Sequence, residues 1–402
     1  MSKVVLLACL LSLAACGGGG GDQQEPPQNT NLVQVESAQS PPQTPVNVNA
    51  CDRNELGEAV TTSLIPSRGM NYPAVVRAID VPSTVLMFSG NFAHQASQAM
   101  LASTPASNSS HIRYPSAQEE LWVAEMDETR TSWITDRRFV FGVRPETPVR
   151  RLGGSSYQAN YPKGFEQSCY DSFQDRQCNV QINDASAITY EIDGEPHYLV
   201  YFTLFENFRW HSPQLGELHA EGPSNPATQN IQAIGLAISK DGRNWEFVDK
   251  VLGESEVDSD LEEILGAWSP SAIVDPQTGL VDVYFHDALG TKQYVAHFSD
   301  GINLIEIERF NKSDMKYRAN LDVIFRNGRY EVMYNDNDYA IASTSFAELD
   351  GFGVECGEKI IIPADSSEVF PTPHQFVNDD GRLHLYYWDF HNDENIIVKI
   401  FE

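Results

Sequence analysis

The stretch AISKDGRNWEF, residues 237–247, predicts two short strands joined by a tight turn. Asp241-Gly242 are the turn residues, because this pair is typical of two-residue hairpin loops. Beyond the turn, Trp245 and Phe247 alternate with polar neighbours, as in a strand with one buried face. One hairpin of this kind is common, but related stretches recur along the chain.

The repeated unit has two parts, both rich in Val, Ile, Tyr and Phe and punctuated by Gly, Asp, Asn and Pro. The first part is an apolar strand, a turn and an aromatic strand, found at 71–92, 183–205, 268–287, 319–336 and 371–389. The second part follows each first part, at 121–133, 235–247, 294–307, 339–352 and 395–402. The opening hairpin is therefore the outer half of a unit that occurs five times.

The spacing of the units indicates the architecture. Pro270, Asn320 and Thr372 begin equivalent strands and lie 50 and 52 residues apart. Four strands in about 50 residues is typical of a propeller blade. We therefore predict an all-β fold, a five-bladed β-propeller with four-stranded antiparallel blades around a central funnel. An accidental repeat within a β-sandwich is the alternative.

Two details of the repeat support blades. Asp241-Gly242 and Asp300-Gly301 predict tight turns with positive φ at the glycine. Trp133, Trp245 and Leu304 hold equivalent positions, where a large side chain can wedge between neighbouring blades. We assign these three side chains to core packing rather than to ligand contact.

The first sixteen residues predict export. Lys3 precedes the apolar run VVLLACLLSLAA, which is too short to span a bilayer and is typical of a signal-peptide core. The run ends in LAAC, which resembles a bacterial lipoprotein processing box and would make Cys16 the lipid-bearing first residue. Gly17 in place of Asp suggests the outer membrane. A plain secretory signal with a free Cys16 is the alternative.

The segment 17–50 is rich in Gly, Gln, Pro and Asn and predicts a flexible linker. The domain then covers 51–402. Of six cysteines, Cys9 leaves with the signal and Cys16 carries the lipid, so four remain for disulfide bonds in an oxidising compartment. The nearest pair, Cys169 and Cys178, closes a short local loop. Cys51 and Cys356 would then tie the start of the domain to a late strand.

The charge of the chain limits its partners. With 27 basic and 56 acidic side chains, its formal net charge is −29. Nucleic acids and anionic lipid head groups both need a basic face, so we expect neither as a partner. We expect the protein to contact a membrane only through its lipid.

Several of these motifs resemble the five-bladed propeller glycosidases, the group of arabinanases, xylosidases, invertases and levansucrases. The resemblance rests on NDASAI and WSPSAI before aromatic strands, on DGEPHYLVYF and DGRLHLYYW, and on SKDGRNW, and it covers about 66–402. It implies a carbohydrate substrate and three acids at the starts of the inner strands, with no required cofactor. A general acid must protonate the leaving oxygen while a second carboxylate activates water or attacks carbon.

The acids of this chain match that pattern in part. Asp184 of blade 2 matches an acid of the family, whereas Asn71-Tyr72-Pro73 has no carboxylate where the first acid is expected. At the corresponding positions blades 3, 4 and 5 offer Ser269, Asn320 and Thr372. Asp287 and Asp336 end second strands, so we name them with Asp184 as candidate catalytic residues. A turn residue that caps backbone amides is the alternative for each. Candidate sugar contacts are Tyr72, Glu206, Trp210, Trp268, His286, Arg318, Trp388 and Asp389.

His374 in PTPHQF is a further candidate. The resemblance implies a histidine near the base of the funnel, in some cases beside a bound Ca²⁺. A buried neutral histidine bonded to the backbone is the alternative. Calcium needs several oxygen ligands, which the acidic residues of this chain can supply.

Two functions remain open at this point. The first is a lipid-anchored glycoside hydrolase-like enzyme that acts on a poly- or oligosaccharide. The second is a propeller that binds carbohydrate, or serves as a scaffold, without hydrolysis. The incomplete set of acids favours the second, whereas the family resemblance favours the first, and the first is our prediction.

Overall fold

The computed structural model describes residues 59–66, 71–81, 84–92, 119–127, 133–136, 138–149, 157–160, 180–206, 231–253, 264, 266–287, 292–309, 319–336, 340–347, 356–363, 372–388 and 395–402. All of them belong to one compact unit, Val46–Glu402. The rest of the chain, Met1–Pro45, is a separate unit outside the described residues. Within the described ranges, no helix has the length and apolar character needed to cross a bilayer.

Blade 1 is a sheet of five antiparallel strands in the order β2-β3-β4-β5-β6. Its strands are β2 (Asn71–Arg77), β3 (Thr84–Phe92), β4 (Glu119–Asp127), β5 (Arg138–Val149) and β6 (Tyr157–Asn160). The prediction of four strands is wrong for this blade. Tyr157–Asn160, within the insertion between the first two repeats, pairs with the outer edge of β5 and adds a fifth strand.

Blades 2, 3 and 4 have four antiparallel strands each, in sequence order from the centre outward. Blade 2 contains β7 (Val180–Ile192), β8 (Glu195–Glu206), β9 (Ile231–Ser239) and β10 (Glu246–Leu252). Blade 3 contains β11 (Trp268–Val274), β12 (Val281–His286), β13 (Gln293–Phe298) and β14 (Leu304–Arg309). Blade 4 contains β15 (Ala319–Arg326), β16 (Arg329–Asn335), β17 (Ile341–Phe346) and β18 (Lys359–Ile362).

Blade 5 combines the two ends of the domain. It contains β19 (His374–Val377), β20 (Leu383–Trp388), β21 (Asn395–Phe401) and, as its outer strand, β1 (Thr61–Pro66). The register runs from Thr61 opposite Ile400 to Pro66 opposite Asn395. The repeat analysis found three strands for this blade and missed the fourth, because β1 lies before the first repeat.

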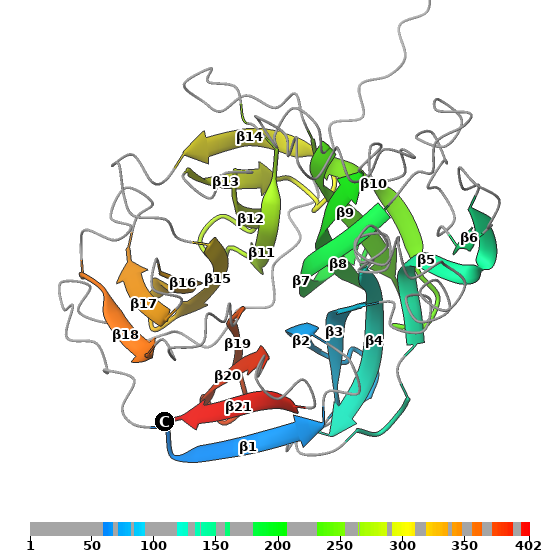
Figure 1. Cartoon of the computed structure of the whole chain (residues 1–402). Coiled ribbons are helices and arrows are strands. Elements are labelled where there is room, and N and C mark those ends of the chain that lie inside the picture. Colours follow the sequence, from blue (N-terminus) through cyan, green and yellow to red (C-terminus); the bar gives the residue numbers. More distant parts are fainter. Residues whose placement is uncertain are drawn as a thin grey trace, which may run out of the picture. The chain divides into compact units, whose positions relative to one another are not determined.

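The five sheets surround a centre lined by their first strands, as Figure 1 shows. Each first strand contacts the next in the circular order β2, β7, β11, β15 and β19. Five apolar clusters fill the five joints between adjacent blades. The predicted five-bladed β-propeller is confirmed.

The three predicted wedges pack where neighbouring blades meet. Trp245 of blade 2 meets the Phe88 ring of blade 1 edge-on, with ring centroids 5.2 Å apart. Trp133 packs on the cluster between blades 1 and 5, and Leu304 packs on the cluster between blades 2 and 3. Their assignment to the core is confirmed.

The two predicted turns share one hydrogen-bond pattern. Asp241 accepts from the backbone N–H groups of Arg243 and Asn244, each at 2.8 Å. In the other turn Asp300 accepts in the same way from the second and third residues after it. Gly242 and Gly301 have φ values of 65° and 79°, so the prediction of positive φ is confirmed.

The inner strands are also joined by side chains. At four of the five joints, a side chain of one inner strand accepts a hydrogen bond from a backbone N–H of the next. These joint acceptors are Ser186 for Ala272 N (2.9 Å), Ser271 for Val323 N (2.8 Å), Asp322 for Gln375 N (2.6 Å) and His374 for Val75 N (2.8 Å). These four acceptors satisfy buried backbone N–H groups, which would destabilise the folded state if they had no hydrogen-bond partner.

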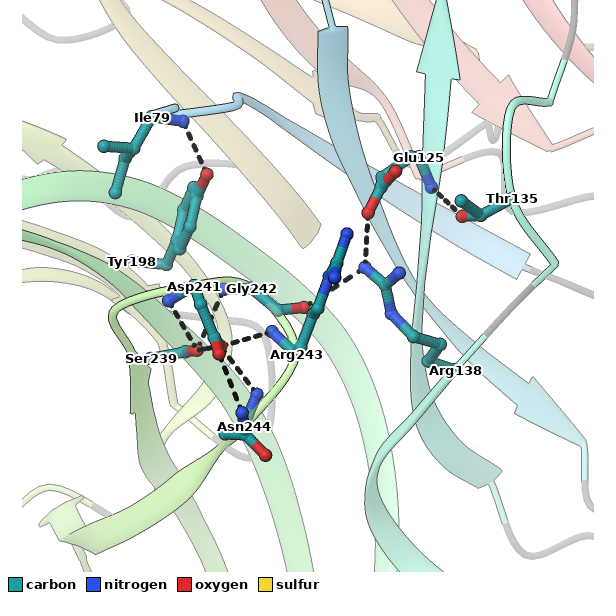
Figure 2. Close-up of polar contacts among 10 residues, drawn as sticks. All are labelled: Ile79, Glu125, Thr135, Arg138, Tyr198, Ser239, Asp241, Gly242, Arg243 and Asn244. Carbon is teal, nitrogen blue, oxygen red and sulfur yellow. Dashed lines mark hydrogen bonds and ion pairs between the residues drawn. The ribbon is translucent and has the colours of Figure 1, made fainter. Parts of the chain in front are cut away.

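The fifth joint, between blades 1 and 2, is built differently. Its equivalent residue is Ala74, which has no side-chain acceptor. Here Ile79 N donates to the Tyr198 hydroxyl at 2.5 Å, and Arg138 bridges Glu125 at 2.8 Å and the Gly242 carbonyl at 3.3 Å. Figure 2 shows these contacts beside the Asp241 turn.

Candidate functional site

Three inner strands carry an irregularity at the same place. Asp184, Ser269 and Asn320 have φ values of 36°, 54° and 52°, which lie in the left-handed region that residues other than glycine rarely adopt. Each lies at a β-bulge between the first two strands of its blade. We call these three residues the bulge ring. Strained backbone and bulges are concentrated at functional sites, and the three residues are the equivalent positions that the sequence predicted for blades 2, 3 and 4.

Asp184 is the carboxylate of the bulge ring. It is 6% exposed, and its Oδ2 accepts a hydrogen bond from Trp268 Nε1 at 2.9 Å. Burial raises the pKa of Asp184 from 3.8 to about 6, against the opposing effect of hydrogen bonds from Trp268 and Ser269. A carboxyl group with this pKa exchanges its proton near neutral pH.

A polar chain leads from Asp184 across two blades. The Ser269 hydroxyl, which helps to lower the pKa of Asp184, donates a hydrogen bond to Asn320 Oδ1 at 3.2 Å. Asn320 Nδ2 in turn donates to Asn335 Oδ1 at 2.8 Å. The backbone of Ser269 is held by Thr203, whose hydroxyl accepts from Ser269 N at 2.8 Å. The bulge ring is thus one connected network.

His286 lies against the Trp268 indole. The two rings have centroids 5.6 Å apart, and the residues are paired across β11 and β12. His286 Nδ1 donates to the Asp287 carbonyl at 2.7 Å, and burial lowers the pKa of the imidazole. The ring is therefore neutral at pH 7, and its Nε2 is a buried acceptor that has no hydrogen-bond partner.

Asp287 and Asp336 occupy equivalent turns after second strands. Asp287 Oδ1 accepts from Lys292 N at 3.3 Å, and Asp336 Oδ1 accepts from Ala340 N at 2.9 Å. Their own backbone N–H groups donate to the carbonyls of the same two partners. Both carboxylates therefore cap backbone amides in turns, which was the alternative to a catalytic role. A catalytic role for either residue stays a prediction.

The other predicted sugar contacts differ in how they are placed. Trp388 ends β20 and is buried, 4% exposed. Tyr72 lies in β2 and Glu206 ends β8, with side chains outside the described part of the structure. Three further candidates lie outside the described residues altogether: Trp210, Arg318 and Asp389.

His374 has partners in two neighbouring blades. Its Nε2 accepts from Val75 N of blade 1, and its Nδ1 lies 3.1 Å from Asp322 Oδ1 of blade 4. Within the described ranges, no group of three or more His, Cys, Asp and Glu side chains could hold a metal ion. A calcium ion beside His374 stays a prediction.

The predicted lipid and disulfide positions are largely outside the described residues, namely Cys16, Cys51, Cys169 and Cys178. Cys356 is disulfide-bonded to a residue outside the described ranges. Its pairing with Cys51 stays a prediction.

The sequence reasoning missed the supports of the site. Ser186 and Ser271 each follow the aligned position of their blade, Asp184 or Ser269, by two residues and serve as joint acceptors. His374 has the same offset from Thr372, and its bond from Val75 N is the backbone contact that was given as the alternative for this histidine. That offset is visible once the repeats are aligned. Thr203 and Asn335 were missed because nothing local distinguishes a polar residue in a second strand from a solvated one.

We expect Asp184→Asn to stabilise the protein above pH 6. Between pH 3.8 and about 6 the folded state keeps a proton that the unfolded state releases, so the free energy of unfolding falls as pH rises through this window. At pH 7.5 the ionised carboxylate costs up to about 3 kcal/mol, which the neutral amide avoids. The measurement is denaturant-induced unfolding at pH 4, 6 and 7.5.

The exposed Asp249 provides the matched control. The gain from Asp184→Asn should shrink toward pH 4, whereas Asp249→Asn should change the free energy of unfolding little at any pH. Equal destabilisation by Asp184→Asn at all three pH values would contradict the assignment of a raised pKa.

No protein-family model matches the sequence, and no curated protein matches it significantly. Among solved structures, a GH43 β-1,3-galactosidase with galactodeoxynojirimycin is similar at 7% identity and TM-score 0.47, covering 86% of this chain and 94% of that one. An α-L-arabinofuranosidase from Lactobacillus brevis has 10% identity and TM-score 0.46, covering 85% and 91%. A GH43 endo-arabinanase from Bacillus licheniformis has 12% identity and TM-score 0.45, covering 84% and 95%. At these values the similarities carry no functional argument.

Proposed function

We propose that this propeller binds a carbohydrate at the bulge ring, with Asp184 as its acidic contact. The observation that carries the proposal is the group of side chains around Asp184. A buried carboxylate lies beside the indole of Trp268 and within a network of hydroxyl and amide groups. Carboxylate, amide and hydroxyl groups bind sugar hydroxyls, and an aromatic ring offers a flat apolar face.

Among the acids that the structure describes, the arrangement fits binding without hydrolysis better than it fits catalysis. Hydrolysis needs a second carboxylate at about 5–10 Å from the first. Asp184 is the only acid of the bulge ring. The two other candidate acids, Asp287 and Asp336, cap turns.

Glycoside hydrolysis is a second candidate, and one observation favours it. Burial raises the pKa of Asp184 to about 6, which is close enough to neutral pH for a carboxyl group that exchanges a proton during catalysis. In this version of the function Asp287 or Asp336 would be the second carboxylate.

A glycan panel separates the two candidates. The full chain is incubated with plant, algal and bacterial glycans, and both bound glycan and released sugars are measured. We expect retention of at least one glycan, and Asp184→Asn should weaken it by roughly tenfold or more, since it removes a charged hydrogen-bond acceptor. Release of sugar that disappears in the variant would instead establish hydrolysis, and neither binding nor release would refute both.

We also propose that the chain is tethered to the bacterial outer membrane by a lipid on Cys16. The LAAC motif supports this proposal. Labelling growing cells with a palmitate analogue should tag the wild-type protein and leave Cys16→Ala untagged. Labelling of both proteins would mean that the lipid, if present, is elsewhere.

A further inference from the structure

One face of blade 3 carries a row of three titratable side chains. Asp282 of β12 lies opposite His297 of β13, and His297 in turn lies opposite Glu306 of β14. Side chains that face each other across paired strands point to the same side of the sheet, with Cβ atoms about 5 Å apart. We call these three residues the charged row. Tyr284 and Val295, two residues away in β12 and β13, pack in the cluster between blades 3 and 4, so the row lies on the face of blade 3 that is turned toward blade 4.

The inner two members of the row form a buried ion pair. Asp282 is 3% exposed, and its Oδ1 accepts a hydrogen bond from His297 Nδ1 at 2.7 Å. The His297 side chain is 14% exposed, whereas Glu306 lies at the surface. A carboxylate buried this deeply destabilises the folded state unless a partner compensates its charge. His297 can donate the hydrogen bond in either protonation state, but it compensates the charge only when it is protonated.

Two further acids act on the charged row. Glu308 of β14 lies on the same face, diagonally across from His297. On the side of blade 4, Asp275 accepts from the Tyr330 hydroxyl of that blade at 3.1 Å. The charge of Asp275 disfavours a second negative charge on Asp282. His297 therefore faces acids on both neighbouring strands, and Asp282 faces one more from the turn after β11.

These acids hold a proton on His297. Burial lowers the pKa of His297, but the hydrogen bond and charge of Asp282, together with the charges of Glu308 and Glu306, raise it by more, so the net shift is upward. The folded state thus keeps this proton at a pH where the unfolded chain has released it. The stability that the proton contributes is complete below pH 6.5 and is lost as pH rises through the higher pKa of the folded state.

Asp282 sets the acid limit of the ion pair. Burial raises the pKa of Asp282, against the opposing hydrogen bond and charge of His297. The carboxyl group therefore gains a proton at a higher pH than an ordinary aspartate does, and both members of the pair are charged only between their two pKa values. The free energy of unfolding also falls as pH rises through the titration of Asp282, because the folded state keeps a proton that the unfolded state releases.

We propose that His297 is a pH-sensitive latch that holds the outer strand β14 to blade 3. In the protonated form, its charge attracts the carboxylates of Asp282 and Glu306 on the two neighbouring strands. After His297 loses its proton, these carboxylates repel each other across β13, and the charge of the buried Asp282 is no longer compensated. β14 is the edge of its sheet, and segments with few partners open before the core does, so this strand should open first at alkaline pH.

Hydrogen exchange of the β14 amides measures the latch directly. Exchange of residues 304–309 in the full chain is followed by mass spectrometry at pH 6.5 and pH 9 and corrected for the intrinsic pH dependence. Protection in the wild-type protein should fall roughly tenfold or more between the two pH values, because the buried ion pair is lost. In His297→Gln, whose amide can still donate to Asp282 but carries no charge, protection should be low at both pH values. The outer strand β10 of blade 2 is the control and should not show this difference.

A titration of the wild-type protein does not depend on the folding of a variant. The ring resonance of His297 is followed by NMR, and it is identified by its absence from the spectrum of His297→Gln. Its midpoint should lie above 6.5, the ordinary value for histidine. Asp282→Asn should lower the midpoint, because it removes the charge that the imidazolium faces at 2.7 Å. The exposed Asp249→Asn is the matched control and should leave the midpoint unchanged.

Three results would overturn the latch. The first is a midpoint of His297 at or below 6.5 in the wild-type protein. The second is a loss of β14 protection with pH that persists unchanged in His297→Gln. The third is an equal loss in β14 and β10, which would mean that the whole domain loosens. The charged row and the bulge ring share no residue, so these results leave the proposed carbohydrate binding untouched.

Discussion

Replacing Ile65 with alanine should lower the free energy of unfolding by about 2–5 kcal/mol. Ile65 lies in the closing strand β1, has no exposed surface, and packs in the cluster that joins blades 5 and 1. The truncated side chain would leave a cavity where the two ends of the domain meet. Urea-induced unfolding followed by tryptophan fluorescence measures the change.

The neighbouring residue provides the control. Leu64 in the same strand is 59% exposed, so Leu64→Ala should change the free energy of unfolding by no more than about 0.5 kcal/mol. Equal effects of the two substitutions would show that β1 does not close blade 5 with the register of the structure.

Gly301→Ala should destabilise the protein by about 2–5 kcal/mol. Gly301 has φ of 79°, where an alanine costs roughly 1–2 kcal/mol. An added Cβ would also lie 2.4 Å from Leu199 Cδ2 and 3.0 Å from the Tyr201 hydroxyl. Overpacking a buried joint costs about 1–3 kcal/mol more, and it would disturb the hydrogen bond from Tyr201 to the Gly301 carbonyl.

Gly279 in the same blade isolates the packing effect. Its φ of 75° is nearly the same, but no atom lies within 4 Å of an added Cβ. Gly279→Ala should therefore cost only the backbone term of roughly 1–2 kcal/mol. If thermal unfolding shows equal losses for the two alanines, the turn of Gly301 does not press against blade 2 as described.

The fold was predictable from the sequence because most of a blade is local. Hairpins join strands that are neighbours in the chain, so turn pairs such as Asp241-Gly242 and the alternation of apolar residues identify them. Five repeats of one unit then indicated five blades. The fifth strand of blade 1 and the closing strand β1 fall outside the repeated pattern and were not predicted.

The site was predictable only in part. Alignment of the repeats placed Asp184, Ser269 and Asn320 at equivalent positions, and the structure puts all three at bulges with positive φ. The alignment did not distinguish an acid in the hydrogen-bond network, such as Asp184, from acids that cap turns, such as Asp287 and Asp336. The sequence predicted that Trp268 contacts a sugar. In the structure its indole N–H also donates a hydrogen bond to Asp184.

The sequence alone determined the number of blades and the position of Asp184, because both follow from a repeat whose contacts lie within a few tens of residues. Only the tertiary structure decided how the ring closes and what surrounds the acid. His374 reaches Val75, 299 residues away, and Trp268 reaches Asp184, 84 residues away. Such contacts depend on the angle between packed blades, and no local pattern of residues encodes that angle.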